Sequence, residues 1–246
     1  MKIKKAFLFL FLFCILFNLS YSEDLPTIRI NISNEPPTLD WNLATDSTSF
    51  QIINNIMGGL TRINNENKIE ANLAKSWEID QSGKKITIKI KKVYWNDGEE
   101  LIAQHFVDSW ERLLNPETAA DYAYFLYDIK NAKEYNLGKI SDFNLVGVKA
   151  LDSKTLEIIL TGRKSYFVSL LSFMSTFPIR KDVIKKYNEK WIEAENIVTL
   201  GNYSLARWEN HNFILLEPRN ISKPKIMLIM NNNPTSTLAM FENGKL

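Results

Sequence analysis

The chain has 246 residues, of which 45% are hydrophobic and 24% are charged, with nine Gly and eight Pro. This composition excludes collagen-like, low-complexity and mainly disordered proteins, and the length suffices for one large or two ordinary domains. The formal net charge of +2 is too small to indicate a nucleic-acid partner.

The N-terminus has the pattern of a secretory signal peptide. Three lysines among the first five residues precede an apolar run over 6–17, and the small residues Ser20 and Ser22 mark a cleavage site. The run is shorter than the roughly 20 apolar residues that a membrane span needs. We therefore expect a signal peptide over 1–22 that is cleaved, and a mature protein in the periplasm.

The chain has one cysteine, Cys14, which lies inside this apolar run. Bacterial lipid attachment requires a small residue before the cysteine, whereas Phe13 stands there. We therefore expect no lipid anchor. Loss of Cys14 with the leader leaves no thiol for a disulfide, a metal site or a nucleophile.

The first half of the mature chain alternates strand and helix patterns. Ile28, Ile30 and Ile32 alternate with polar residues and predict a half-buried strand over 27–33. The further predicted elements are a helix that Ser47 caps and that runs through Asn55, a hairpin of strands over 76–80 and 86–91, a turn over 94–98 and a helix over 103–114.

The second half continues this alternation. The predicted elements are helical pieces within 117–138, a hairpin of strands over 146–150 and 155–160, helices over 165–173 and 181–187, strands over 203–208, 213–217 and 225–230, and a helix over 235–243. Together these elements predict a mixed α and β fold rather than an all-β sandwich.

Catalytic motifs are absent. The sequence contains no HExxH, GxSxG, P-loop or GxGxxG pattern, and it has only two histidines. We expect His105 at the surface or at its boundary, because it stands in a helical pattern, and His211 at a hairpin tip. Core packing is the expected role of three tryptophans, Trp77, Trp95 and Trp110. We therefore expect no enzyme, no cofactor and no metal site.

A string of short motifs identifies a family. The motifs are 35–40 (EPPTLD), 73–78 (LAKSWE), 94–99 (YWNDGE), 106–112 (FVDSWER), 115–119 (NPETA), 146–152 (VGVKALD), 155–157 (TLE), 166–167 (YF) and 196–199 (NIVT). In this order and spacing the chain resembles the family 5 extracytoplasmic solute-binding proteins of ABC importers, and the resemblance covers nearly all of 27–217.

The resemblance implies a two-lobed protein of the periplasmic binding protein-like class II, whose cleft closes around a peptide. It implies that this chain is the N-terminal part only, truncated before the second lobe. By comparison with the family, we expect the first part of lobe I over 23–63, an inserted small α+β domain over 64–165, and an incomplete return to lobe I over 166–246. The family's basic and acidic residues for the peptide termini lie in the second lobe, so none is assigned here.

The resemblance also implies peptide-binding residues. Glu35 matches an acidic cleft residue, the backbone of Ser33, Asn34 and Glu35 would pair with an extended peptide, and Tyr122 matches a cleft tyrosine. Two alternatives stay open, because Glu35 is also suited to capping a helix or to standing exposed. Tyr122 is equally suited to core packing, with Tyr124 as a competing candidate.

Some segments depart from the family pattern. The family commonly has Asn-Gly-Pro-Tyr where this chain has 200–203 (LGNY), and the region from Ile221 onward aligns poorly. The expected function is the substrate-binding component of an ABC transporter for oligopeptide uptake, in a truncated form. Its expected partners are short peptides and a permease in the inner membrane, and we expect a monomer. The alternative is a secreted interaction or adhesion module that is no longer competent in transport.

Overall fold

The structure is a computed structural model that describes residues 25–246. The predicted signal peptide and Cys14 lie outside the described residues. The strands are β1 (Thr27–Ile32), β2 (Thr61–Ile63), β3 (Ile69–Ala71), β4 (Ala74–Ile79), β5 (Lys85–Ile90), β6 (Val148–Asp152), β7 (Thr155–Ile159), β8 (Tyr203–Glu209), β9 (Phe213–Pro218) and β10 (Lys225–Met230). The α-helices are α2 (Ser47–Ile56), α3 (Ala103–Leu114), α4 (Ala132–Asn136), α5 (Phe167–Leu170), α6 (Lys181–Tyr187) and α7 (Pro234–Glu242). Five 3₁₀ turns are η1 (Pro116–Thr118), η2 (Ala123–Leu126), η3 (Phe143–Leu145), η4 (Met174–Thr176) and η5 (Asn188–Ile192).

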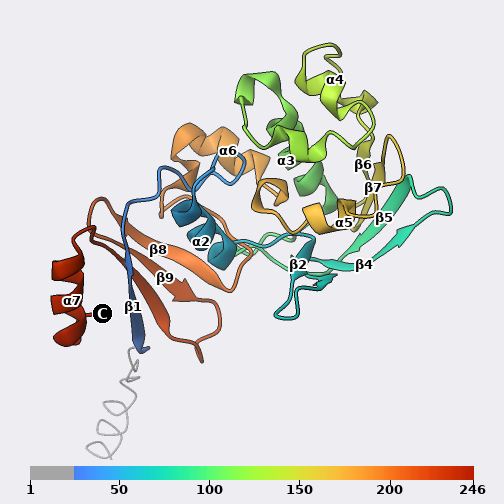
Figure 1. The fold of residues 1–246 in the computed structure, drawn as a ribbon. Coiled ribbons are helices and arrows are strands. Elements are labelled where there is room, and N and C mark those ends of the chain that lie inside the picture. The colour runs from blue at the N-terminus through green and yellow to red at the C-terminus, as the bar shows by residue number, and fades with distance from the viewer. Residues whose placement is uncertain (1–24) are drawn as a thin grey trace, which may run out of the picture.

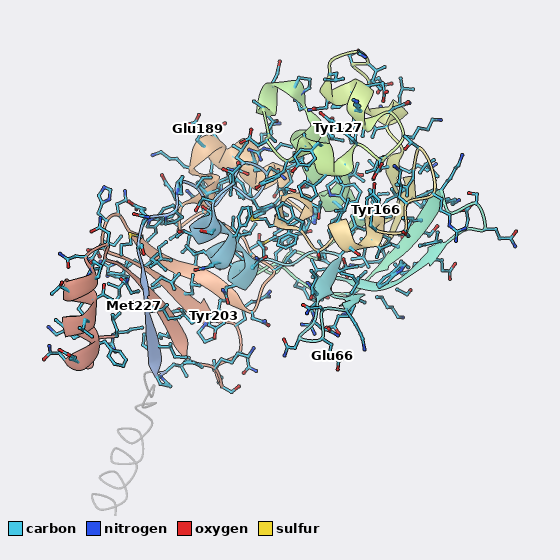
Figure 2. All side chains as sticks on the ribbon, in the orientation of Figure 1. Glu66, Tyr127, Tyr166, Glu189, Tyr203 and Met227 are labelled. Carbon is cyan, nitrogen blue, oxygen red and sulfur yellow. The ribbon has the colours of Figure 1, made fainter. Side chains whose placement is uncertain are left out.

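The first and last strands of the chain meet in one four-stranded sheet with the order β1-β10-β9-β8. β1 pairs in parallel with β10, and the other two pairings are antiparallel. Because neighbouring residues in register share a face, one face carries Ile32, Leu228 and Ile214, which are buried. Helix α7 lies outside this sheet, at the far end of the molecule from β4–β7 (Figure 1). The labelled Met227 lies on the face toward α7 (Figure 2).

A second four-stranded sheet has the order β4-β5-β7-β6 and is antiparallel throughout. On its central strand β5, Ile86, Ile88 and Ile90 are buried, while Lys85 and Lys89 are exposed. This arrangement confirms the predicted hairpin with one wet face. A separate two-stranded ladder of β2 and β3, which the sequence analysis did not predict, lies between the two sheets (Figure 1).

Helix α3 packs against the second sheet through a fully buried face. Its Trp110 donates its indole hydrogen to the carbonyl of Thr176 at 2.9 Å, and Ser109 donates to the carbonyl of Phe177 at 2.6 Å. At the end of the helix, Arg112 donates to both oxygens of Asp40, at 2.9 and 2.6 Å. The pair with Asp40 ties α3 to the loop after β1, and the bonds to Thr176 and Phe177 tie it to the segment at η4.

The structure corrects four details of the predicted elements. The N-cap of α2 is Asp46 rather than Ser47, since its carboxylate accepts from the amide of Ser49. The helix predicted over 165–173 is reduced to the four residues of α5, and the 3₁₀ turn η4 follows it. Ile28 and Ile30 are 49% and 44% exposed, so β1 is not half-buried along its length. The reason is that β1 is an edge strand, and within 25–246 nothing covers its apolar face at these positions.

The fourth correction concerns His105, which is buried rather than at the surface. It lies on the face of α3 that packs on Trp95, and its ring contacts that indole edge to face with centroids 5.6 Å apart. Trp95 and Trp110 are fully buried and Trp77 packs against the core, as predicted. Within residues 25–246, none of the helices has the length and apolar content to cross a membrane.

Candidate functional site

An open groove of about 930 Å³ lies beside the start of the loop that follows β1. Three segments far apart in the sequence form its walls: the loop at 35–37, the η5 region at 189–195, and the end of β8 with its turn at 206–211. Glu189, at the start of the second wall, is labelled above the sheet (Figure 2). The groove therefore depends on tertiary structure and has no compact sequence signature.

Glu35 has two side-chain partners in this groove. One carboxylate oxygen, Oε1, accepts the indole hydrogen of Trp208 at 2.8 Å, and the other, Oε2, lies 2.8 Å from Nδ1 of His211. The Glu35 side chain is 22% exposed, so it is largely enclosed yet reachable from the groove. Glu35 does not cap a helix, because its partners Trp208 and His211 come from β8 and the turn after it.

Carboxylates dominate the lining of the groove. Glu35 is joined there by Glu189, Glu193, Glu195 and Glu209. The one arginine of the lining, Arg207, is paired with Glu209 at 2.7 Å. Because like charges at this density raise the local negative potential, the groove favours a cationic group over an anionic one.

Ser33 and Asn34 follow β1 directly, and both are exposed. Ser33 lines a different, apolar hollow between β1 and α7, together with Leu238 and Phe241. The structure therefore places Ser33 and Glu35 beside two separate hollows, although only one residue separates them in the chain.

Tyr122 lies in an aromatic cluster of five rings: Phe50, Tyr122, Tyr124, Phe125 and Phe173. Its ring packs edge to face on Phe173, with centroids 5.1 Å apart, and it is half-buried. Tyr124, the competing candidate, is 55% exposed. Tyr122 does not line the groove at Glu35, so these two predicted residues are not brought into one pocket within the described chain.

Sequence reasoning missed Trp208 as a groove residue. If the side chains of β8 alternated strictly, Arg207 would lie on the same face of the sheet as the buried Leu205. Trp208 would then lie on the opposite face. A register shift between Leu205 and Arg207 reverses this, so that Trp208 pairs with the buried Ile214. His211 lies at a hairpin tip, as predicted. It was not connected with Glu35 because 175 residues lie between the two in the sequence.

Carboxylates, one arginine, one histidine and one indole line the groove. Within the described residues no group of three or more His, Cys, Asp or Glu side chains is placed to hold a metal ion. Its chemistry consists of hydrogen-bonding and ionic groups around an accessible carboxylate. Such a site suits reversible binding of a polar ligand.

Comparison with known proteins identifies the family. A sequence model of the bacterial extracellular solute-binding proteins, family 5, matches residues 68–246. The chain belongs to this family. The motifs from the loop after β1 to the region before β8 therefore carry a true relationship, and the mixed α and β fold is that of its solved members.

Family 5 relatives include proteins with different named ligands. The chain is 34% identical over 235 residues to an oligopeptide-binding protein OppA of Bacillus subtilis, covering 92% of this chain and 43% of the relative. It is 32% identical over 200 residues to a probable deoxycholate-binding periplasmic protein of Escherichia coli, covering 76% and 37%. The names of both relatives describe binding proteins.

The fold of this family 5 chain matches solved structures. The substrate-binding domain of an oligopeptide ABC transporter from Bacillus anthracis superposes with a TM-score of 0.85 at 31% identity, covering 91% of this chain and 45% of that one. The chain thus spans less than half the length of the relatives it matches.

Proposed function

We propose that the chain is the extracytoplasmic substrate-binding component of an ABC transporter for oligopeptide uptake, and that its groove contributes to peptide binding. The observation that carries this proposal is the position of Glu35, whose carboxylate is held in the groove by Trp208 and His211. Family membership and the names of the relatives support the ligand class.

The physical character of the groove agrees with peptide binding. The groove is open and rimmed by charged side chains, and water can fill the space between a ligand and its walls. A wet site of this kind tolerates different side chains, while main-chain groups hold the peptide backbone. We propose that Ser33, Asn34, Glu35 and Tyr122 are the peptide-binding residues of this chain.

The remaining parts of the proposal concern location, partners and domains. We propose a monomeric periplasmic protein that delivers its ligand to an inner-membrane permease and catalyses no reaction. We also propose a main domain over 23–63 and 166–246, with a small domain inserted over 64–165. The separate sheets β1-β10-β9-β8 and β4-β5-β7-β6 support this division.

Peptide binding can be tested by ¹H–¹⁵N NMR of the purified protein. Titration with short peptides should shift the indole resonance of Trp208, and Glu35→Gln should weaken the binding by about tenfold because a charge-assisted hydrogen bond is lost. Glu66→Gln, an exposed carboxylate outside the groove, is the matched control and should leave it unchanged.

Two results would count against the proposal. A Trp208 resonance that no peptide moves would reject peptide binding at the groove. Deoxycholate, added in a parallel titration, would replace peptide as the proposed ligand if it alone moved this resonance. The adhesion-module alternative is tested by a pull-down from an envelope extract, because recovery of a permease would contradict it.

A further inference from the structure

A side chain of the protein already occupies the position of a cation at Glu35. Nδ1 of His211 lies 2.8 Å from Oε2 of Glu35, on the oxygen that Trp208 does not use. Trp208 therefore bonds to Oε1 of Glu35, and His211 contacts Oε2. The imidazole therefore competes with a ligand cation for Oε2.

The imidazole is weakly held. The side chain of His211 is 89% exposed, and within residues 25–246 Glu35 is its only ionic or hydrogen-bonding partner. His211 stands at the tip of the turn between β8 and β9 with φ near 60°, a left-handed backbone conformation. An ion pair this exposed contributes little, so a better cation can replace it.

If His211 is displaced, several glutamates of the groove remain near Glu35. Glu189, Glu193 and Glu195 come from the wall opposite Glu35, and within the described chain none of them has a cationic partner. On β8, Glu209 is already paired with Arg207 at 2.7 Å and accepts from Asn212. The groove therefore has unneutralised carboxylates for an incoming ammonium or guanidinium group.

Resting on the function proposed above, we propose that the groove binds the cationic group of a peptide at Glu35 and that His211 is the specificity-determining residue which this group displaces. The cationic group is a terminal amine or the side chain of Lys or Arg. Histidine gains its charge between about pH 8 and about pH 5. Protonated His211 competes for Glu35 more strongly than the neutral ring, so cationic peptides bind more tightly as the pH rises.

Other charged groups line the groove beside Glu35. They are Glu189, Glu193 and Glu195 on one wall, and Arg207 and Glu209 on the other. Carboxylates and guanidinium groups titrate far from neutral pH in ordinary surroundings. His211 is the one histidine among the residues that line the groove.

The test uses three peptides and the indole resonance of Trp208. The three peptides are C-terminal amides: acetyl-Ala-Met-Ala-amide is uncharged, Ala-Met-Ala-amide carries a terminal amine, and acetyl-Ala-Lys-Ala-amide carries a side-chain amine. Affinities of the purified protein are measured at about pH 5.5 and about pH 7.5. A cationic peptide should bind about three- to fivefold more tightly at the higher pH, the range expected for an exposed ion pair. The uncharged peptide should show no change.

The variant His211→Asn separates the role of the charge from that of the turn. Asparagine tolerates a positive φ, so the turn is kept while the titrating group is removed. The variant should bind cationic peptides equally well at both pH values. Whether the terminal amine, the lysine or both respond identifies which cation reaches Glu35.

Three outcomes are decisive against the inference. Equal affinity for charged and uncharged peptides at both pH values would overturn it while leaving peptide binding intact. A pH dependence that persists in His211→Asn would show that another group is responsible. Absence of binding by all three peptides would reject the proposed function, and the inference with it.

Discussion

The indole of Trp208 donates to Oε1 of Glu35 at 2.8 Å, although 172 residues lie between the two in the chain. Trp208 lies on β8 and Glu35 follows β1, and these strands form opposite edges of the sheet β1-β10-β9-β8. The loop after β1 therefore passes over the end of the sheet to reach the far edge. This hydrogen bond joins the loop after β1 to the strand at the opposite edge of the sheet.

Replacing Trp208 by phenylalanine should release Glu35 with limited loss of packing. The variant keeps an aromatic ring over Ile214 and removes the donor to a carboxylate, which costs about 1–2 kcal/mol in unfolding free energy. Urea denaturation measures this loss. Peptide affinity should also fall, because the carboxylate is no longer held in place.

Trp77→Phe is the matched control for that experiment. Trp77 is half-buried on β4, as Trp208 is on β8, but within the described residues its indole nitrogen has no hydrogen-bond partner. Its replacement should cost clearly less stability than Trp208→Phe. Equal losses in the two variants would mean that packing, and not the bond to Glu35, accounts for the effect.

The ion pair of Arg112 and Asp40 joins α3 to the loop that contains Glu35. The Asp40 side chain is 6% exposed, and Arg112 also donates to Oδ1 of Asn42 at 2.8 Å. Arg112→Met leaves a buried carboxylate without its cation, which costs about 3–5 kcal/mol. Differential scanning calorimetry should show a large fall in Tm.

A double-mutant cycle distinguishes the pair from general packing. Asp40→Asn in the Arg112→Met background removes the uncompensated charge, so the double variant should regain part of the stability lost in the single variant. If the two losses simply add, the ion pair makes no specific contribution and the prediction is wrong.

Much of the fold could be predicted from the sequence because its periodicity is local. Alternating isoleucines defined β5, and the bounds of α6 and β10 were predicted as the structure has them. The short β2 and β3 were missed because three residues are too few to display a period. The exposure of Ile28 and Ile30 could not be inferred either, since it depends on the neighbours of β1 and not on its own pattern.

The site was only partly accessible to sequence reasoning. The resemblance of the chain to the family pointed to Glu35. It did not connect Trp208 or His211 with that residue. Their contact depends on the register shift in β8 and on a loop that crosses the sheet, and neither leaves a signal in local sequence. A tryptophan near the end of an otherwise alternating strand was the one available indication.

His105 should make the stability of the protein depend on pH. Burial, together with the nearby guanidinium of Arg180, lowers the pKa of His105 to about 4. Its Nδ1 accepts from the indole of Trp95 at 3.2 Å and from the amide of Ile102 at 3.4 Å, so a proton there would meet two donors. The folded state therefore favours the neutral ring.

The direction of the effect follows from linkage. Between about pH 6.5 and pH 4 the unfolded state binds a proton at this residue and the folded state does not, so stability falls as the pH falls. The contribution is fully present above the unfolded pKa, and the difference of about 2.5 pKa units corresponds to about 3 kcal/mol. In His105→Gln the slope of unfolding free energy against pH should be smaller over this range. An unchanged slope would assign the acid sensitivity to other groups.

Gly201 should not tolerate a side chain, because backbone atoms occupy the space. A Cβ atom there would lie 2.4 Å from the carbonyl oxygen of Asn55 and 2.4 Å from the carbonyl carbon of Ile56. The amide of Gly201 also donates to the carbonyl of Ile56 at 2.7 Å, which holds the chain against the end of α2. Gly201→Ala should therefore destabilise the protein by about 2–3 kcal/mol.

Gly162→Ala is the control, because its Cβ would meet nothing within 4 Å. Thermal unfolding should show a loss in the first variant and almost none in the second. Similar Tm values for the two would show that the segment before β8 can move away from α2 without cost.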